Sequence, residues 1–407
     1  MNCRFCNIKV EHLFVSLGSS PLSNSYLTEE QLHKMEPFYP LDIYVCKNCF
    51  LVQLDEFESP ENIFSEYAYF SSYSDTWLKH AKDYADKMTE RFGFNTHSFI
   101  IEIASNDGYL LQYFIEKGIP ILGIEPAVNV AETARQKGIP TETVFFGTET
   151  AKRLASEGKY ADLLIGNNVL AHVPNLNDFV AGLKIILKPR GITTMEFPHL
   201  MKLVDEVQFD TIYHEHFSYF SFLTVKKVFN AHGLTLFDVE ELPTHGGSLR
   251  IYACHADDKS KEVSQRITEL EKQEINAGYT DINFYLHFSE KVKSIKRNIM
   301  KFLIQAKENG KTIVGYGAPA KGNTLLNYCG IRNDFLDYTV DRNPHKQGLY
   351  LPGSHIPIES SDRIKKTKPD YVLILPWNIK DEIIEQISYI REWGGKFVIP
   401  IPEVKVL

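Results

Sequence analysis

Short apolar runs alternate with helix-like segments through the middle of the chain. The runs at 99–103, 121–125 and 161–165 each consist of buried-strand residues, and each leads into polar side chains. Apolar residues at helical spacing over 109–115 follow the first run, and residues 187–196 predict a helix end, a turn and a strand. Strands that alternate with helices predict an α/β fold with a mainly parallel sheet, in which ligands bind at the carboxyl ends of the strands.

A second alternation of the same kind occupies the last hundred residues. Its predicted strands cover 311–317, 335–341, 371–376 and 396–400. Residues 260–310, which precede it, are rich in Lys, Glu and Gln and carry apolar residues at helical spacing, which predicts long connecting helices with a solvated face. The pattern therefore predicts two α/β regions in one chain.

The composition is that of an ordinary globular protein. The chain has 407 residues, of which 43% are hydrophobic and 24% are charged, and its net charge is −8. This excludes a disordered chain, and the acidic balance argues against a large basic surface for nucleic acid. With no apolar run long enough to span a bilayer and no apolar signal segment, we expect a cytosolic protein with no membrane partner. The oligomeric state stays open, with a monomer as the working expectation.

Four of the six cysteines form two C-x-x-C pairs near the N-terminus. The pairs are Cys3 with Cys6 and Cys46 with Cys49. Two such turns can direct four thiolates at one tetrahedral metal ion, and zinc suits this set best, with iron as the lesser alternative and four incidental thiols as the plain one. Four thiolates leave no open coordination position, so the predicted zinc site is structural.

The first predicted strand runs into a loop that suits a nucleotide. Residues 102–108 occupy the place of the E/D-x-G-x-G-x-G motif of class I methyltransferases, which bind S-adenosylmethionine (SAM), but only Gly108 keeps a glycine, since Ala104 and Asn106 replace the other two. Glu125 ends the next strand, where a carboxylate can accept both ribose hydroxyls. Asn167 and the residue after it end a third strand and could flank the sulfonium or the adenine. The alternative is an α/β domain that binds another nucleotide or none.

Several motifs together resemble the sugar-nucleotide C-methyltransferases of deoxysugar pathways, of the dTDP-3-amino-4-ketohexose C-3 methyltransferase type. The likeness spans essentially the whole chain, and its motifs are the two cysteine pairs, 102–108, 123–126, 167–174, 213–216, 315–322 and 341–348. The resemblance implies a zinc-binding domain at 1–70, a class I, Rossmann-like SAM-dependent methyltransferase domain at 71–255 and a Rossmann-like α/β substrate domain at 256–407.

The resemblance also implies two cofactors and a substrate: SAM, a structural Zn²⁺ and a nucleotide-diphosphate sugar. The aromatic stretch 65–73 is either core or a lid over a pocket. The residues that we assign to SAM are Glu102, Ala104, Ser105, Asn106, Asp107, Gly108, Glu125, Pro126, Asn167, Asn168 and Tyr67.

The segment around 209–221 is the densest in chemically active side chains. His214 and His216 flank Glu215, and the three side chains could form a metal site, although no H-E-x-x-H spacing is present. The plain alternative is that the two histidines belong to the core. Imidazole titrates near neutral pH and can act as a general base. The resemblance implies that His216 is the general base, that Tyr213 is an alternative base or hydrogen-bond donor, and that Glu215 orients the site. It assigns enolate stabilisation to His172.

A second glycine loop lies in the C-terminal region. Residues 315–320 match G-x-G-x-x-G/A after a strand, and Asp341 ends the next strand, so NAD is one interpretation. A lysine beside a helix start favours a phosphate instead, and the resemblance implies the nucleotide-sugar substrate. The substrate-binding residues that we assign are Gly317, Ala318, Lys321, Gly322, Asn323 and Lys346.

Together these features predict a SAM-dependent methyltransferase that acts at C3 of a nucleotide-linked 4-keto-6-deoxysugar. Base-catalysed removal of the C3 proton would give an enolate that attacks the SAM methyl group. The rival hypotheses are an NAD-dependent sugar-nucleotide oxidoreductase, O- or N-methylation of a nucleotide sugar, and a non-catalytic, zinc-anchored scaffold.

Overall fold

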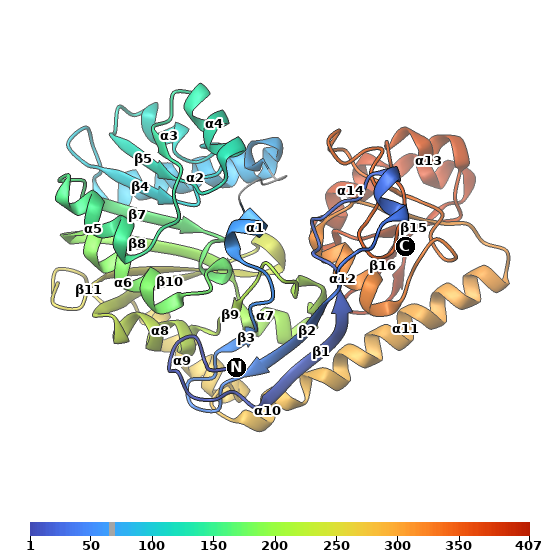
Figure 1. Cartoon of the computed structure of the whole chain (residues 1–407), viewed down its shortest axis with the longest axis horizontal. Helices are drawn as coiled ribbons and strands as arrows, with labels where there is room; N and C mark the ends of the chain where they lie inside the picture. The colour runs from blue at the N-terminus through green and yellow to red at the C-terminus, as the bar shows by residue number, and fades with distance from the viewer. Residues whose placement is uncertain (65–69) are drawn as a thin grey trace. The chain divides into compact units, whose positions relative to one another are not determined.

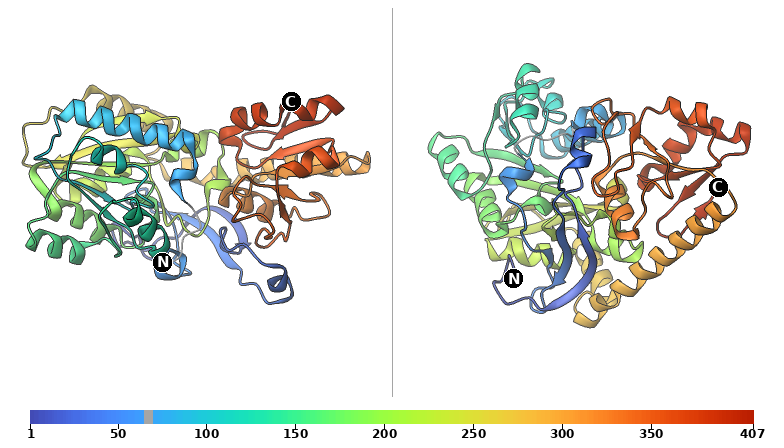
Figure 2. Two further views of the ribbon diagram at one scale, coloured as in Figure 1. Left: turned by 90° about the horizontal axis from the view of Figure 1, so that it is seen from above. Right: turned by 45° about the vertical axis from the view of Figure 1, so that its right-hand side comes forward.

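The computed structural model describes residues 1–64 and 70–407, which form two compact units. The first unit comprises Met1–Val10, Cys46–His199 and Phe217–Thr280, and the second comprises Glu11–Val45, Leu200–His216 and Asp281–Leu407. Figures 1 and 2 show both units as ribbons. Each is therefore assembled from segments that are far apart in the sequence.

The first unit is built on a seven-stranded sheet. Its strands are β4 (Ile100–Ile103), β5 (Ile121–Ile124), β6 (Thr141–Glu142), β7 (Ala161–Asn167), β8 (Leu187–Pro198), β10 (Leu234–Leu242) and β11 (Ser248–His255). Their order is β10-β11-β8-β7-β4-β5-β6, and β11 alone runs antiparallel to both of its neighbours. The predicted parallel, class I methyltransferase sheet is confirmed.

Helices follow most of the parallel strands of this sheet. They are α3 (Gln112–Ile115), α4 (Val128–Gln136), α5 (Thr148–Ser156), α6 (Leu176–Ile186) and α8 (Phe222–Ala231), with α1 (Pro60–Phe64) and α2 (Asp75–Phe92) before the sheet and α9 (Gln265–Ala277) after it. Helix α2 begins where the Ser74 side chain accepts from Trp77 N and ends at Gly93 with φ 69°. Its buried residues, among them Tyr84 and Met88, pack into the core of the unit.

Two short strands complete the first unit. β3 (Val52–Leu54) and β9 (Ser218–Tyr219) pair antiparallel beside the cysteine pairs. All three residues of β3 are buried, as a strand covered on both faces requires.

The second unit has its own mainly parallel sheet. Its strands β12 (Ile313–Tyr316), β13 (Thr339–Val340), β14 (Ile358–Glu359), β15 (Tyr371–Ile374), β16 (Lys396–Ile399) and β17 (Lys405–Val406) have the order β14-β13-β12-β15-β16-β17. Only β17 is antiparallel to its neighbour. The hairpin of β1 (His12–Ser20) and β2 (Tyr39–Val45) belongs to the same unit, with helices α7 (Leu200–Asp205), α10 (Ile282–Leu286), α11 (Phe288–Glu308), α12 (Ala320–Cys329), α13 (Asp362–Thr367) and α14 (Lys380–Gln386).

Three segments differ from the pattern-based expectation. The turn expected near 187–191 lies inside β8, where Gly191 packs so closely on Ala161 that a Cβ would meet the Ala161 carbonyl at 2.7 Å. The strand expected over 335–341 shrinks to β13, and β10 has no counterpart in the prediction. The long helices predicted within 260–310 are confirmed as α9 and α11, which the short helix α10 separates.

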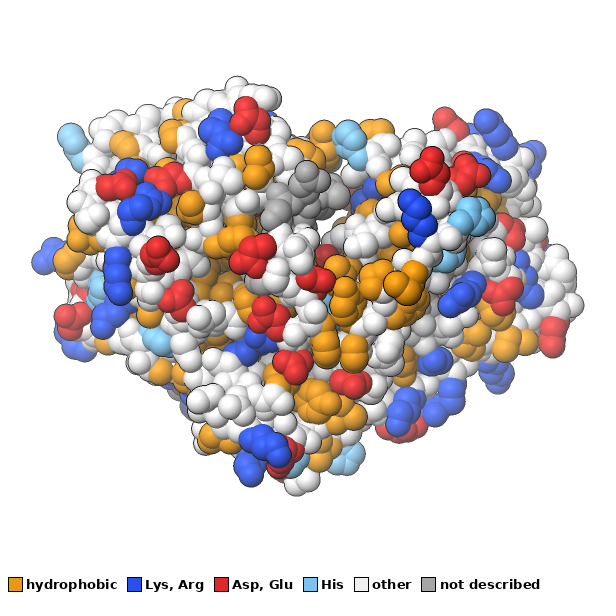
Figure 3. Space-filling model, viewed as in Figure 1, with side chains coloured by type: hydrophobic (Ala, Val, Ile, Leu, Met, Phe, Trp, Pro, Cys, Tyr) orange, Lys and Arg blue, Asp and Glu red, His pale blue; other side chains and the backbone are white. Residues whose placement is uncertain are grey.

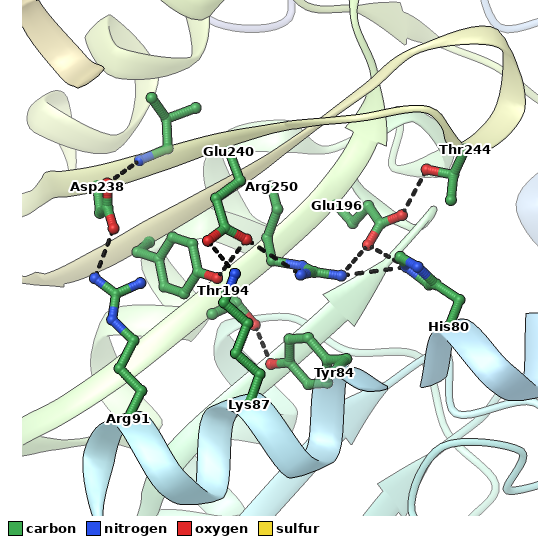
Figure 4. A network of polar contacts seen from close by, with 12 residues as sticks. His80, Tyr84, Lys87, Arg91, Thr194, Glu196, Asp238, Glu240, Thr244 and Arg250 are labelled. Atoms are coloured by element: carbon green, nitrogen blue, oxygen red, sulfur yellow. Dashed lines mark hydrogen bonds and ion pairs between the residues drawn. The ribbon is translucent and has the colours of Figure 1, made fainter. Parts of the chain in front are cut away.

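A buried polar network joins α2 to the β8, β10 and β11 strands of the first unit (Figure 4). The Arg250 guanidinium donates to Glu196 at 2.9 Å and approaches Glu240 at 3.3 Å, and both carboxylates lie beneath the surface. His80 from α2 contacts Glu196 at 3.0 Å, and Lys87 pairs with Glu240. The network therefore fixes one face of α2 by charge as well as by apolar packing.

None of the described helices has a stretch that is long and apolar enough to cross a membrane. On the face shown in Figure 3, acidic and basic side chains are interspersed.

The Glu196 carboxylate gives the first unit a defined response to acid. Burial alone would raise the pKa of Glu196, but the His80 hydrogen bond and the Arg250 charge lower it to about 2. A carboxyl whose pKa is depressed on folding stabilises the fold above its unfolded value, and that stability is lost as the pH falls from about 4.5 to about 2. We expect the wild-type protein to lose about 2 kcal/mol through this group between pH 7 and pH 3, and Glu196→Gln to lack that loss. Urea unfolding at pH 7 and pH 3 measures it, and identical pH dependence in both proteins would contradict it.

Candidate functional site

The four cysteines of the two pairs meet at one point in the first unit. Their Sγ atoms all lie within 4.8 Å of one another, and the Cys3–Cys49 and Cys6–Cys46 separations are both 3.5 Å. A tetrahedral zinc ion with bonds of 2.3 Å places its sulfur ligands about 3.8 Å apart. The set therefore fits zinc, and no ligand position is left for a substrate.

The two cysteine turns have the same backbone geometry. Asn7 N donates to Cys3 O and Phe50 N donates to Cys46 O, both at 2.9 Å. Asn7 and Phe50 both have left-handed backbones, with φ 58° and 63°. Such a residue after the second cysteine closes each turn so that both thiols point the same way.

Side chains around the cysteines connect the zinc turn to the loop of His172. Buried Gln53 donates to Cys3 Sγ at 3.3 Å and accepts from Arg4 N at 2.9 Å. The Arg4 guanidinium donates to Pro174 O at 3.1 Å. Pro174 follows the short 3₁₀ helix Leu170–His172, so the zinc turn holds the segment that positions half-buried His172.

The predicted cofactor loop keeps the backbone of a glycine-rich loop with one glycine. Ala104, Asn106 and Gly108 have φ values of 56°, 49° and 76°. These are the three positions at which the class I motif carries glycine, and a left-handed backbone is strained for any residue with a Cβ. At Gly108 a Cβ would meet Ile139 Cδ1 at 2.1 Å, so that position also requires glycine for space.

Glu125 holds this loop from the end of the neighbouring strand. Its carboxylate accepts from Asn106 N and from Ala127 N, both at 2.9 Å. Burial raises the pKa of Glu125, and the two N–H donors oppose that rise. Each carboxylate oxygen has a second lone pair, so Glu125 can brace the loop and still accept a ribose hydroxyl.

Residues from before α2 close over the same loop. Ser71 N donates to Asn106 Oδ1 at 2.9 Å, and the Ser72 hydroxyl donates to the buried Asp107 carboxylate. Lys137 pairs with Asp107 at 2.9 Å and contacts the Ser72 hydroxyl at 3.0 Å. The aromatic stretch thus ends in a clamp on the cofactor loop, although its residue Tyr67 lies outside the described residues.

The remaining predicted cofactor residues lie in the same region. Glu102 is fully buried in β4, and burial raises its pKa well above the ordinary value. The nearby Tyr109 hydroxyl accepts from Asn167 Nδ2 at 3.5 Å. Ser105 is buried inside the loop, and Pro126 follows Glu125. The carboxyl ends of β4, β5 and β7 therefore carry all described members of the predicted SAM set.

The histidine segment belongs to the second unit, where a backbone carbonyl fixes His216. Its Nδ1 lies 2.8 Å from Thr211 O, and the Tyr213 ring lies 4.1 Å away between centroids. A carbonyl oxygen can only accept, so Nδ1 carries a proton and the neutral ring has its lone pair on Nε2. Glu215 is buried and accepts from Asn24 Nδ2 at 2.6 Å. His214 instead contacts Pro40 O at 3.1 Å, and burial lowers its pKa, as expected of a core histidine.

The second glycine loop uses its own amides internally. Gly317 N donates to Val340 O at 2.6 Å and Ala318 N donates to Asp341 Oδ2 at 2.7 Å. The side-chain amide of Asn323 donates through Nδ2 to Ser23 O at 2.5 Å. A Cβ on Gly322 would meet Leu375 Cβ at 3.0 Å. Of the predicted substrate residues, the two lysines are therefore the groups best suited to phosphate.

Both lysines lie beside the glycine loop. Lys346 Nζ donates to Ala318 O at 2.9 Å and lies 5.0 Å from the centre of the Tyr26 ring. Lys321 Nζ donates to Asn378 Oδ1 at 2.9 Å and lies 5.0 Å from the Trp377 ring centre. Burial lowers the pKa of Lys321, and the charge of Asp210 opposes that change.

The segment that precedes the histidines is anchored on α12, the helix that carries Lys321, and on Trp377, which follows β15. Trp377 Nε1 donates to Asp210 Oδ2 at 2.7 Å, and Thr324 Oγ1 donates to Ile212 O at 2.9 Å. Asp210 is fully buried, and burial raises its pKa to about 6. The second unit thus connects the predicted base to the predicted phosphate-binding lysine.

No motif in the sequence marks Trp77, His80, Glu196 or His245. Trp77 stacks on the Tyr109 ring at 5.9 Å and contacts the His245 ring at 5.2 Å. For His245, the sequence signal was the Gly-Gly pair that follows it, because such a pair favours a left-handed turn between two strands of a hairpin.

Comparison with known families and proteins covers the whole chain. Three family profiles match, namely a zinc binding domain over 3–64, a methyltransferase domain over 77–239 and a C-methyltransferase C-terminal domain over 243–402. The chain is 35% identical over 405 residues to the C-methyltransferase NovU of Streptomyces niveus, which is 100% of this chain and 96% of that protein.

More partial likenesses involve other methyltransferases. A ubiquinone biosynthesis O-methyltransferase of Bartonella bacilliformis is 26% identical over 97 residues, or 23% of this chain and 38% of that protein. The solved magnesium protoporphyrin IX methyltransferase of Synechocystis is 13% identical with a TM-score of 0.35, covering 44% of this chain and 83% of that one. A likeness this partial carries no functional argument.

Replacing Ala104 with glycine should relieve the strain in the cofactor loop. At φ 56° the alanine Cβ crowds the following carbonyl, so we expect Ala104→Gly to raise the free energy of unfolding by about 0.5–1 kcal/mol. The matched control is Ala134→Gly, at a buried position of helix α4, which should lower it by about 1 kcal/mol. Urea unfolding measures both, and a loss of stability in Ala104→Gly would refute the strained backbone.

Proposed function

The chain belongs to the SAM-dependent C-methyltransferases, and from that premise we propose that it methylates C3 of a nucleotide-linked 4-keto-6-deoxysugar. Membership confirms the resemblance and the two predicted cofactors, SAM and zinc. The substrate, the position of methylation, the residue roles, the three-domain division and a cytosolic location are part of the proposal.

The geometry of His216 carries the proposal. The hydrogen bond from Nδ1 to Thr211 O leaves the basic lone pair on Nε2, in a ring that is almost wholly buried. Such a ring can take a proton from carbon, because its tautomer and orientation are set before the substrate binds. Tyr213 lies against the same ring, where its hydroxyl can donate to the developing enolate.

The proposed reaction follows from these groups. His216 Nε2 takes the C3 proton, which the C4 ketone makes acidic, and the C–H electron pair becomes the enolate. His172, which would serve as the second histidine of the site, would donate to the enolate oxygen. The enolate electron pair at C3 would then form the new carbon–carbon bond to the methyl group that SAM would supply when bound, while the methyl–sulfur electron pair would stay on sulfur.

Lysine chemistry supports a nucleotide-diphosphate sugar. Lys321 and Lys346 lie beside one glycine loop, and α12 begins at the next residue after Pro319. Cations at such a loop suit a diphosphate. NAD is the rival ligand for this loop, because Asp341 accepts one backbone N–H on each oxygen and, like Glu125, keeps a second lone pair on each.

The test of this function uses SAM and a panel of dTDP-, GDP- and CDP-linked 4-keto-6-deoxysugars with deuterium at C3. Mass spectrometry should show one methyl gained and the deuterium lost for one nucleotide series. A methyl gained with deuterium retained would instead identify O- or N-methylation, and hydride exchange with NAD would identify an oxidoreductase.

Replacing His216 should remove the base and spare cofactor binding. We expect His216→Asn to lower kcat by about 10²–10⁴-fold, the usual contribution of a positioned general base. The dissociation constant for SAM, measured by calorimetry, should change by less than about twofold, because we assign SAM binding to the cofactor loop and Glu125 and not to His216. The matched control His33→Asn alters an exposed histidine of the same unit and should keep kcat. A kcat retained in His216→Asn would contradict the assignment.

Replacing Lys321 should affect substrate binding more than turnover. We expect Lys321→Met to raise KM for the nucleotide sugar by about tenfold or more with a smaller change in kcat, since phosphate contacts are made in the ground and transition states alike. Lys311→Met, which removes a surface lysine paired with Asp370, is the control. Unchanged KM in steady-state kinetics of Lys321→Met would exclude a phosphate contact.

A further inference from the structure

The loop between β10 and β11 holds a histidine in a strained backbone. His245 has φ 57°, and Gly246 and Gly247 follow with φ 91° and 113°. Three successive residues in this region are costly, and a histidine there carries strain that the glycines do not. The histidine side chain is therefore the part of the loop that needs a function.

His245 contacts a second strained residue at the edge of the sheet. Its Nε2 lies 3.0 Å from Nδ2 of Asn168, which follows β7 and has φ 53°. Asn168 is also held by its backbone, since its N–H donates to Glu196 O at 2.7 Å. Two non-glycine residues with left-handed backbones thus meet side chain to side chain at the carboxyl end of β7.

The contact fixes both the histidine tautomer and the orientation of the amide. The Asn168 NH₂ group can only donate, so His245 Nε2 accepts and the neutral ring carries its proton on Nδ1. With Nδ2 committed to His245, the carbonyl oxygen Oδ1 must point the other way. Within the described residues, Asn168 Oδ1 and Asn167 Oδ1 are both buried and have no hydrogen-bond partner.

Neighbouring side chains hold the His245 ring in place. The Trp77 ring contacts it edge-on at 5.2 Å, and Trp77 itself stacks on His80 at 4.8 Å. Beside His245, the Thr244 hydroxyl donates to Glu196 at 2.9 Å, as Figure 4 shows. The network under α2 thus supports the loop on which His245 lies.

We propose that His245 is a positioning residue, which turns the Asn168 carbonyl oxygen toward the sulfonium of bound SAM. The proposal rests on the proposed function, in that it places SAM at the carboxyl ends of β4, β5 and β7. A sulfonium is a cation whose methyl C–H bonds are polarised, so it favours amide oxygens and disfavours amide NH₂ groups. If the amide were reversed, Asn168 would present donors to a cation.

The charge on sulfur provides a test that a purely structural role would not pass. SAM carries the sulfonium, whereas S-adenosylhomocysteine has the same adenosine and amino acid parts around a neutral sulfur. An amide held by His245 should therefore favour SAM in particular. General damage to the site would weaken both ligands alike.

Calorimetric titration of SAM and S-adenosylhomocysteine into the full-length wild-type protein, His245→Phe and His245→Gln measures this difference. His245→Phe keeps a ring against Trp77 but has no acceptor, and we expect its affinity for SAM to fall about tenfold while S-adenosylhomocysteine changes by less than about twofold. His245→Gln restores an acceptor oxygen and should recover most of the lost SAM affinity. His245→Asn, which suits a left-handed backbone but is too short to reach Asn168, replaces the Phe variant if that protein does not fold.

Equal loss of both ligands, or no loss of either, would overturn the role of His245. A wild-type protein that bound neither ligand would instead overturn the location of the SAM site and with it the proposed function. Thermal unfolding of the ligand-free variants confirms that each is folded before titration.

Discussion

Three left-handed residues in a five-residue loop set the geometry of the first unit's cofactor region. Ala104, Asn106 and Gly108 turn the backbone after β4, and Glu125 holds the turn by accepting from Asn106 N. The conformation is that of a glycine-rich loop, obtained without two of its glycines. The strain at the two replaced positions must be offset by the surrounding contacts, which include the Ser71 and Ser72 clamp and the Lys137–Asp107 ion pair.

Each unit carries its own set of predicted functional residues. The first carries the cysteine cluster, the cofactor loop and His172, and the second carries the histidine segment and the lysine-flanked glycine loop. Within each unit, polar contacts link the predicted functional side chains to the framework. Arg4 connects the zinc turn to the loop of His172, and Trp377 and Thr324 anchor the segment before His216. Backbone carbonyls and buried side chains thus orient the groups that would react.

The sequence predicted features that depend on local pattern, such as strands β4, β5 and β7, the cysteine cluster and the helices α9 and α11. It could not show that 11–45 and 200–216 join the C-terminal segment in one unit, because that grouping depends on contacts between distant segments. It also could not show that the amides of Gly317 and Ala318 are used internally, since a glycine motif does not reveal which acceptors lie nearby. His245 was missed for a related reason. Its importance comes from its contact with Asn168, 77 residues away.

The central claim is that the imidazole of His216, rather than the neighbouring phenol of Tyr213, removes the C3 proton. Exchange of the C3 hydrogen of the sugar with deuterated water, followed by NMR with S-adenosylhomocysteine in place of SAM, isolates that step from methyl transfer. The account predicts that the wild-type enzyme catalyses the exchange, that His216→Asn abolishes it and that Tyr213→Phe slows it without abolishing it. Exchange that persists in His216→Asn and disappears in Tyr213→Phe would contradict the account and assign the base to the tyrosine.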